Sequence, residues 1–152
     1  MSRLLSLMLI CSTFALIGCG TGEDQSATNT STSSTQVEDS PGEWVTTDSG
    51  LKYRILREGN GKKPTKANSV TVHYEGTLDS GEIFDSSYTR GATATFPLTQ
   101  VIAGWTEGLT YVDEGGKIEL EIPPQLGYGN NRAGSIPPNS TLHFKVELVR
   151  IQ

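Results

Sequence analysis

The sequence predicts an α+β domain in which one short helix covers an antiparallel β-sheet. Several segments alternate apolar and polar residues with a period of two, one segment has helical spacing, and Gly-, Pro- and Asn-rich turns separate them. A strand that alternates in this way buries one face and leaves the other in water. The apolar face of such a sheet needs a cover, and the helical segment is the candidate for it.

The strand predictions rest on alternation. Apolar residues occupy every second position of four segments, which are residues 51–56, 70–75, 118–122 and 142–148. Asp79-Ser80-Gly81 has the composition of a hairpin turn, and it would join the stretch 74–78 to a further short strand at Ile83-Phe84. Hairpin connections make neighbouring strands antiparallel, so we expect an antiparallel sheet.

The helix prediction covers residues 101–111. Its apolar residues fall on roughly one face, and they are Val101, Ile102, Trp105 and Leu109. The segment is short and contains Gly104 and Gly108. Aromatic residues elsewhere come from separate strand or loop segments, and they are Tyr74, Phe84, Phe96, Tyr128 and Phe144. Aromatic side chains from so many elements, converging on Trp105, would form either a core or an apolar pocket.

Residues 1–18 are predicted to be a lipoprotein signal peptide. Arg3 precedes an apolar run that ends at Ile17 and is shorter than the roughly 20 residues that a membrane-spanning helix needs. The run closes with Leu16-Ile17-Gly18-Cys19, which resembles the bacterial lipobox. This resemblance implies cleavage before Cys19 and lipidation of Cys19. An ordinary signal peptide with an unrelated cysteine is the alternative.

Residues 19–43 are predicted to be a lipid-anchored, disordered tether. The stretch 20–43 contains no Lys, Arg or aromatic residue, and Ala27 and Val37 are its apolar side chains. Such a segment cannot bury enough surface to offset the entropy lost on ordering. A flexible coil of this length reaches roughly 25–30 Å. A weakly folded extension is the alternative, and the folded domain is predicted to span residues 44–152.

Charge and cysteine content exclude several function classes. The tether holds 5 of the 17 acidic residues, and residues 44–152 hold 12 acidic and 11 basic ones, a net charge of about −1. No basic face for nucleic acid is predicted. Cys11 and Cys19 both precede the domain, so a disulfide or thiol catalyst inside it is excluded. His73 and His143 occupy outward strand positions without ligand spacing, so no metal site or other cofactor is predicted.

Five short motifs follow one another in a fixed order. They are Val72-His73-Tyr74-Glu75-Gly76, Phe84-Asp85-Ser86-Ser87, Val101-Ile102-Ala103-Gly104-Trp105, Tyr128-Gly129 and Ile136-Pro137-Pro138. Their order and spacing resemble the FKBP-type peptidyl-prolyl cis-trans isomerases, and the bacterial Mip-like branch in particular, over about residues 46–152. The resemblance implies a strongly bent antiparallel sheet, a half-barrel, wrapped around one short helix, with the active site between them.

The resemblance also implies the site residues. Catalytic positions are Phe84, Asp85 and Tyr128. Substrate-binding positions are Tyr74, Phe96, Val101, Ile102, Trp105, Ile136 and Phe144. In the family, the backbone N–H at the Ile102 position and the hydroxyl at the Tyr128 position hold carbonyls of the bound peptide, and Trp105 would form the pocket floor.

Three departures from the family pattern affect the loops. Ala94 stands where many members have an aromatic residue, and Ser135 replaces an apolar residue that is common in the loop. The segment 98–101 is one residue shorter than in the best-known small eukaryotic members. These departures put loop contacts and sequence preference in question and leave the centre of the pocket unchanged.

The implied function is peptidyl-prolyl cis-trans isomerisation of X–Pro bonds in proteins that fold in the cell envelope, without covalent or metal catalysis. A non-catalytic peptide-binding chaperone module with the same fold is the alternative. The expected partners are proline-containing unfolded or folding proteins and a membrane, through the N-terminal lipid. A macrolide-type inhibitor could occupy the pocket. We expect a monomer, anchored in the outer membrane and facing the periplasm if the source is Gram-negative.

Overall fold

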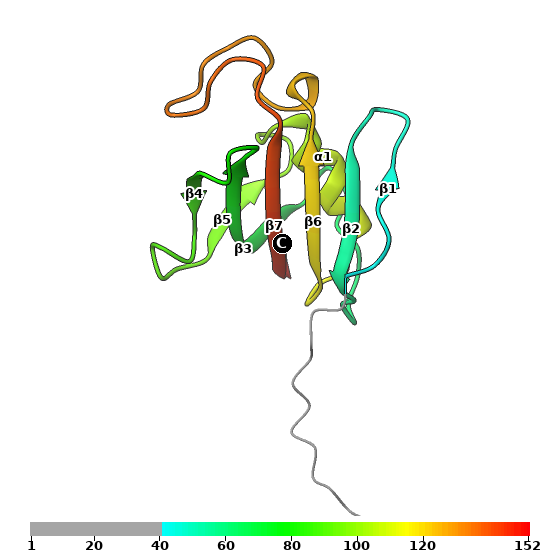
Figure 1. The fold of residues 1–152 in the computed structure, drawn as a ribbon. Helices are drawn as coiled ribbons and strands as arrows, with labels where there is room; N and C mark the ends of the chain where they lie inside the picture. The colour runs from blue at the N-terminus through cyan, green and yellow to red at the C-terminus, as the bar shows by residue number, and fades with distance from the viewer. Residues whose placement is uncertain (1–40) are drawn as a thin grey trace, which may run out of the picture. The chain divides into compact units, whose positions relative to one another are not determined.

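The structure is a computed structural model that describes residues 41–152 as one antiparallel sheet with one α-helix (Figure 1). The predicted signal peptide, Cys19 and the tether up to residue 40 lie outside the described residues. The strands are β1 (Val45–Thr46), β2 (Lys52–Arg57), β3 (Ser69–Leu78), β4 (Ile83–Ser86), β5 (Ala94–Pro97), β6 (Lys117–Ile122) and β7 (Leu142–Ile151). The helices are α1 (Ala103–Gly108) and two 3₁₀ turns, η1 (Leu109–Tyr111) and η2 (Pro124–Leu126).

The strands lie in the order β1-β2-β6-β7-β3-β4, and every neighbouring pair is antiparallel. Strand β3 has two partners on the side away from β7. Its first half pairs with β5, where Val70 lies opposite Phe96. Its second half pairs with β4, where Gly76 lies opposite Asp85. Through these pairings, β3 aligns residues from two later segments along one edge of the sheet.

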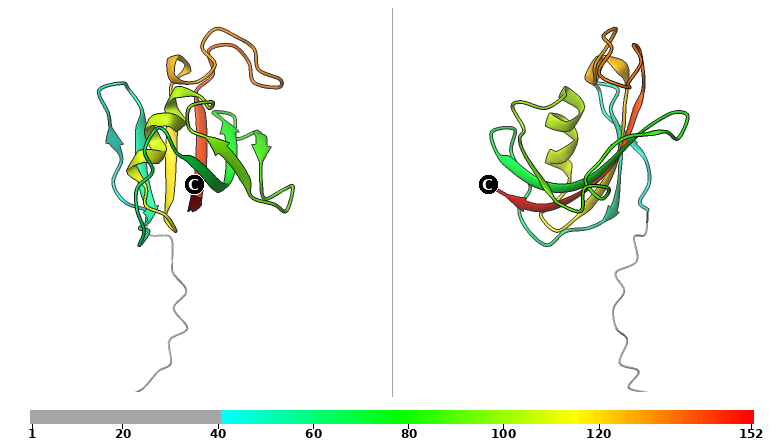
Figure 2. Two further views of the ribbon diagram at one scale, coloured as in Figure 1. Left: turned by 180° about the vertical axis from the view of Figure 1, so that it is seen from behind. Right: turned by 90° about the vertical axis from the view of Figure 1, so that its left-hand side faces the viewer.

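The sheet bends around α1, which lies on its concave face (Figure 2, right). The core between them consists of fully buried aliphatic residues, which include Val70, Val72, Leu109, Ile118, Leu120, Ile122, Leu142, Val146 and Leu148. The inward side chains of β6 and β7 alternate with charged ones on the convex face. The predicted fold class, an α+β half-barrel around one short helix, is confirmed.

The helix is shorter than predicted. Ile102 has an extended backbone (φ −59°, ψ 149°), and its carbonyl accepts the N–H groups of Trp105 and Thr106 at 2.9 and 3.1 Å. Val101 and Ile102 therefore precede the helix and do not open it, and the end of the predicted segment is the 3₁₀ turn η1. The spacing of apolar residues predicts which face of the segment is buried. It does not predict the residue at which the helix begins.

Two strand features also differ from the prediction. In the alternating segment 51–56, the period of two places Leu56 on the polar face with Lys52 and Arg54, but it is only 7% exposed. The pairing of β2 with β6 shifts register between Ile55 and Arg57, and this bulge turns Leu56 inward. Strand β1 was not predicted because it has two residues, too few to show alternation.

Helix α1 lies unusually close to β6. A Cβ atom on Gly104 would lie 2.5 Å from Cγ2 of Ile122, and one on Gly108 would lie 2.7 Å from Cδ2 of Leu120. Both glycines are buried. The backbone of the helix, with no side chain between, therefore packs directly on the sheet.

We expect Gly104→Ala to lower the free energy of unfolding by about 1–3 kcal/mol because the added methyl overpacks against Ile122. The loss should appear although Ala is favoured over Gly in a helix by about 1 kcal/mol. Urea denaturation measures it. Ala103→Ser, which adds one atom at an exposed position of the same helix, is the control. An unchanged or raised stability of Gly104→Ala would contradict the close-packing argument.

Candidate active site

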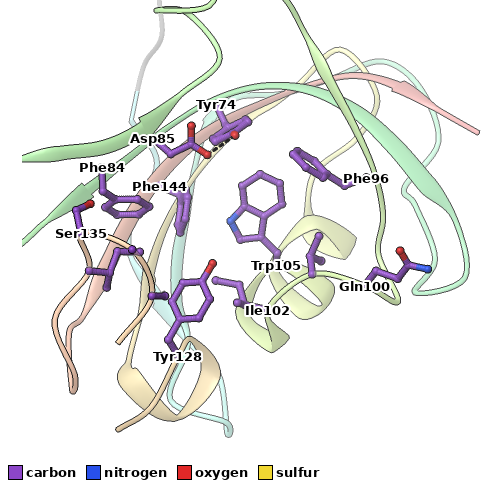
Figure 3. A pocket seen from close by; sticks show the side chains of 14 residues that line it. Tyr74, Phe84, Asp85, Phe96, Gln100, Ile102, Trp105, Tyr128, Ser135 and Phe144 are labelled. Carbon is purple, nitrogen blue, oxygen red and sulfur yellow. Dashed lines mark hydrogen bonds between the residues drawn. The ribbon is translucent and has the colours of Figure 1, made fainter. Parts of the chain in front are cut away.

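A cavity of about 410 Å³ opens between α1, the edge of the sheet and the loop that precedes β7 (Figure 3). It is lined by Tyr74, Phe84, Asp85, Phe96, Gln100, Val101, Ile102, Trp105, Tyr128, Ala133, Gly134, Ser135, Ile136 and Phe144. All ten residues predicted as catalytic or substrate-binding lie in this cavity. Their roles there remain predictions.

Trp105 forms the centre of the aromatic wall. Its ring meets Tyr74, Phe96 and Phe144 edge to face, with centroids 5.3, 5.6 and 5.2 Å away. The indole is only 4% exposed. Its N–H has no hydrogen-bond partner among residues 41–152, and the nitrogen lies on the side of the ring that faces Phe144 (Figure 3). The aromatic cluster is therefore core and pocket wall at once.

Gly76 of β3 makes room for two of these rings. A Cβ at this position would lie 2.6 Å from Cζ of Phe84 and 2.7 Å from Cε1 of Phe144. The two rings meet edge to face over this glycine, 5.4 Å apart at an interplanar angle of 86°. Any side chain at position 76 would displace the rings from the cavity wall.

Asp85 has both carboxylate oxygens occupied. The Tyr74 hydroxyl donates to Oδ2 at 2.5 Å, and the Arg90 guanidinium donates to Oδ1. Arg90 also donates to the Tyr74 hydroxyl at 2.7 Å, so the three groups form a closed triangle. Arg90 was not among the predicted site residues, because a single Arg in a turn carries no periodic signal.

This triangle keeps Asp85 ionised beside an apolar cavity. Burial by itself would raise the pKa of Asp85, but the hydrogen bonds from Tyr74 and Arg90, together with the Arg90 charge, outweigh burial and lower it. Burial, followed by the hydrogen bond to Asp85, raises the pKa of Tyr74. At neutral pH the site therefore holds a carboxylate and a neutral phenol, each in a fixed orientation.

Two hydrogen-bond donors at the cavity have no partner among the residues that the structure describes. The hydroxyl of Tyr128, a residue 41% exposed, makes no hydrogen bond within residues 41–152, and neither does the N–H of Ile102. These are the two groups expected to hold peptide carbonyls. Gln100 and Ser135 add polar side chains to the lining and were not predicted as site residues. Their place in loops, where side-chain direction follows no period, explains why.

The histidines lie outside the cavity. His73 Nδ1 is 3.1 Å from the buried Ser87 hydroxyl, and its ring stacks on Tyr88 with centroids 4.9 Å apart. His143 Nε2 lies 2.7 Å from Asp79 Oδ1. Between residues 41 and 152, no three His, Cys, Asp or Glu side chains gather as metal ligands. In the same range, no helix has the length and apolar character needed to cross a membrane.

We expect Asp85→Asn to lower the free energy of unfolding at pH 7 by on the order of 1 kcal/mol, because the carboxylate is partly exposed. A lowered pKa stabilises the fold above the ordinary Asp pKa of about 3.9. That contribution disappears as pH falls through the folded value, so the difference between wild type and variant should close in acid. Urea titrations at several pH values test this. Glu82→Gln, an exposed change on the neighbouring hairpin, is the control, and a difference independent of pH would contradict the assignment.

The chain matches the family model described as FKBP-type peptidyl-prolyl cis-trans isomerase over residues 60–149. It is 50% identical over 107 residues to the FKBP-type peptidyl-prolyl cis-trans isomerase FkpA of Escherichia coli strain K12, a match that covers 70% of this chain and 40% of FkpA. It is 51% identical over 104 residues to the peptidyl-prolyl cis-trans isomerase Mip of Coxiella burnetii, covering 68% of this chain and 45% of Mip. The chain thus matches less than half the length of these curated relatives.

Two solved structures of FKBP proteins have a fold similar to that of this chain. The crystal structure of FkpA from Escherichia coli superposes with a TM-score of 0.70 at 49% identity, covering 72% of this chain and 51% of that one. The crystal structure of AtFKBP13 superposes with a TM-score of 0.67 at 37% identity, covering 73% of this chain and all of that one. With the family model, the curated relatives and the fold in agreement, the chain belongs to the FKBP-type peptidyl-prolyl cis-trans isomerase family and is similar to its FkpA and Mip members.

Proposed function

We propose that this chain catalyses cis-trans isomerisation of X–Pro bonds in proline-containing polypeptides. The observation that carries the proposal is the aromatic cavity, in which all ten family positions surround about 410 Å³ of space beside one fixed carboxylate. Family membership supports it, since the matched model and both curated relatives bear the name of this activity.

The chemistry suits an apolar site. Rotation about an X–Pro bond crosses a barrier of about 18–20 kcal/mol in tens to hundreds of seconds, because the planar amide is stabilised by resonance. The planar ground state is more polar than the twisted transition state, so an apolar cavity destabilises the former more. No covalent bond forms or breaks and no proton is transferred. A 10⁵-fold acceleration would require about 7 kcal/mol of such differential effects.

The proposed roles follow from position. Phe84 forms a wall that holds the proline ring, and Trp105 forms the floor. The free donors, the Tyr128 hydroxyl and the Ile102 N–H, bind carbonyl groups of the peptide. Asp85 acts by orientation and by its field, because Tyr74 and Arg90 already occupy its oxygens. The other binding residues supply apolar contacts, and they are Tyr74, Phe96, Val101, Ile136 and Phe144.

We expect Phe84→Ala to lower kcat/KM roughly 10- to 100-fold, since it removes about 1.5–3 kcal/mol of apolar contact. Tyr128→Phe should cost less, roughly 2- to 10-fold, because it removes one hydrogen bond worth about 0.5–1.5 kcal/mol. A protease-coupled assay on one X–Pro peptide measures both. The rate should not respond to EDTA.

Tyr88→Phe is the matched control, because this exposed tyrosine lies outside the cavity. A wild-type rate in Phe84→Ala would contradict the proposed wall. If the wild-type protein bound the peptide but did not accelerate its isomerisation, the chain would instead be a non-catalytic peptide-binding module.

We further infer that the protein is exported, cleaved before Cys19 and held in the cell envelope by a lipid on Cys19. The lipobox-like Leu16–Cys19 and the composition of residues 20–43 support this. The Gly42 N–H donates to the Ile55 carbonyl at 2.8 Å, so pairing with the sheet edge begins beside the proposed tether boundary at residue 43. Gly20 replaces the Asp that often follows the lipidated Cys in inner-membrane lipoproteins of enterobacteria, which favours the outer membrane in a Gram-negative source.

We expect Cys19→Ser to move the protein from the membrane fraction to the soluble fraction, because the lipid attaches through the Cys19 thiol. Cell fractionation with immunoblotting shows the shift, and mass spectrometry of the wild-type protein should find a lipid-modified Cys19 at the mature N-terminus. Cys11→Ser serves as the control, since Cys11 lies in the segment that is removed. An unmodified Cys19 in soluble wild-type protein would contradict the anchor.

A further inference from the structure

A second groove lies between the β1–β2 hairpin and the α1–η1 segment. Its volume is about 480 Å³, and it shares no lining residue with the aromatic cavity. Residues from both sides meet there, among them Val45, Asp48, Tyr53, Glu107 and Tyr111. Helix α1 therefore contributes to two separate hollows, through Trp105 to the aromatic cavity and through Glu107 to this groove.

Two tyrosine rings lie side by side in this groove. Tyr53 and Tyr111 are parallel, with centroids 4.4 Å apart and an interplanar angle of 1°. Both side chains are half-buried, and neither hydroxyl makes a hydrogen bond within the part of the chain that the structure describes. The faces of such rings attract the planar guanidinium of Arg and the ammonium of Lys.

The groove carries two carboxylates without a cation. Glu107 is fixed by the Ser49 hydroxyl, which donates to its Oε2 at 2.7 Å, and Asp48 is exposed beside it. Neither carboxylate has an ion-pair partner among residues 41–152, and no Lys or Arg lines the groove. Burial is the largest cause that raises the pKa of Tyr111, and the nearby charges of Glu107 and Asp48 raise it further.

The convex face of the sheet shows the opposite arrangement. There Glu119, Glu121 and Glu147 pair with Arg54, Lys52 and Arg57 at 2.6, 2.8 and 2.7 Å. The carboxylates of the groove differ in this respect from these three. The groove also borders a strand edge, since within residues 41–152 β1 pairs only with β2, and Val45 is 45% exposed. An extended segment could pair with that edge.

We propose that this groove is a second polypeptide-binding site, which holds an extended segment of a client chain containing Arg or Lys. The cationic side chain would stack on the tyrosine pair and bind the carboxylates of Asp48 and Glu107. Residues 20–43 contain five acidic and no basic residues, so their charge does not complement this groove. The proposal rests on the proposed function only in taking the ligand to be a polypeptide.

A proline-free nonapeptide that alternates Arg with Val and Thr, labelled with fluorescein, is the probe. Fluorescence anisotropy with the full mature protein should show binding that weakens with salt, and at least 10-fold weaker binding to the Asp48→Asn/Glu107→Gln double variant. Glu58→Gln/Glu82→Gln is the matched control, because it removes the same charge from two exposed residues outside the groove. If both double variants bound the peptide equally weakly, net charge alone would explain the loss of affinity, and the proposal would be overturned.

Amide chemical shifts locate the peptide. Titration should move the signals of residues 45–49, 107 and 111 and leave those of Ile102 and Tyr128 in place. The isomerase rate of both double variants on an uncharged X–Pro peptide should equal the wild-type rate. Shifts centred on the aromatic cavity, or wild-type affinity in Asp48→Asn/Glu107→Gln, would overturn the proposal. Because the probe lacks proline, a chain without isomerase activity would still give a clear result.

Discussion

The contact between α1 and β6 is the constraint on which the site depends. At Gly104 and Gly108 the helix backbone rests on Ile122 and Leu120 with no side chain between them. A helix of six residues with two glycines has little stability of its own, so it exists because the sheet holds it. The same closeness fixes the depth of Trp105, which lies between the two glycines in the sequence. The two glycines that lower the helix propensity of this segment are thus the same residues that let Trp105 lie close to the sheet.

The site also combines an ionised carboxylate, that of Asp85, with a cavity whose walls are mainly aromatic. An apolar wall disfavours an ionised carboxylate, yet Asp85 stays ionised because Tyr74 and Arg90 bind it from the side. The side chains of Arg90 and Asp85 are 49% and 42% exposed, so this ion pair remains partly hydrated. The aromatic rings thus remain the main surface that a bound proline would meet.

Sequence reasoning succeeded where a residue's surroundings follow from its own periodicity. Strands β3, β6 and β7 each bury one face, so alternation located them and the aromatic residues they carry. Leu56 was misplaced because a bulge changes the register, and a bulge depends on the partner strand. Arg90 was missed because its contacts depend on how the turn after β4 folds back. Family motifs supplied the loop residues Tyr128 and Ile136, which periodicity alone would not have assigned to the cavity.

The second groove could not be predicted from the sequence, because it depends on contacts between segments that are distant in the chain. Its residues come from the β1–β2 hairpin and from the end of the helical segment, and neither half has a pattern that points to a ligand. The two hollows also differ in chemistry, since one is apolar and aromatic and the other is aromatic and acidic. Residues of α1 line both the aromatic cavity and the second groove, and contacts at Gly104 and Gly108 hold α1 against the sheet. The distance between the cavity and the groove is therefore fixed. A client that filled both would gain affinity through effective concentration, without any conformational change between them. Such binding would favour client chains in which a proline and a basic residue are separated by a fixed number of residues.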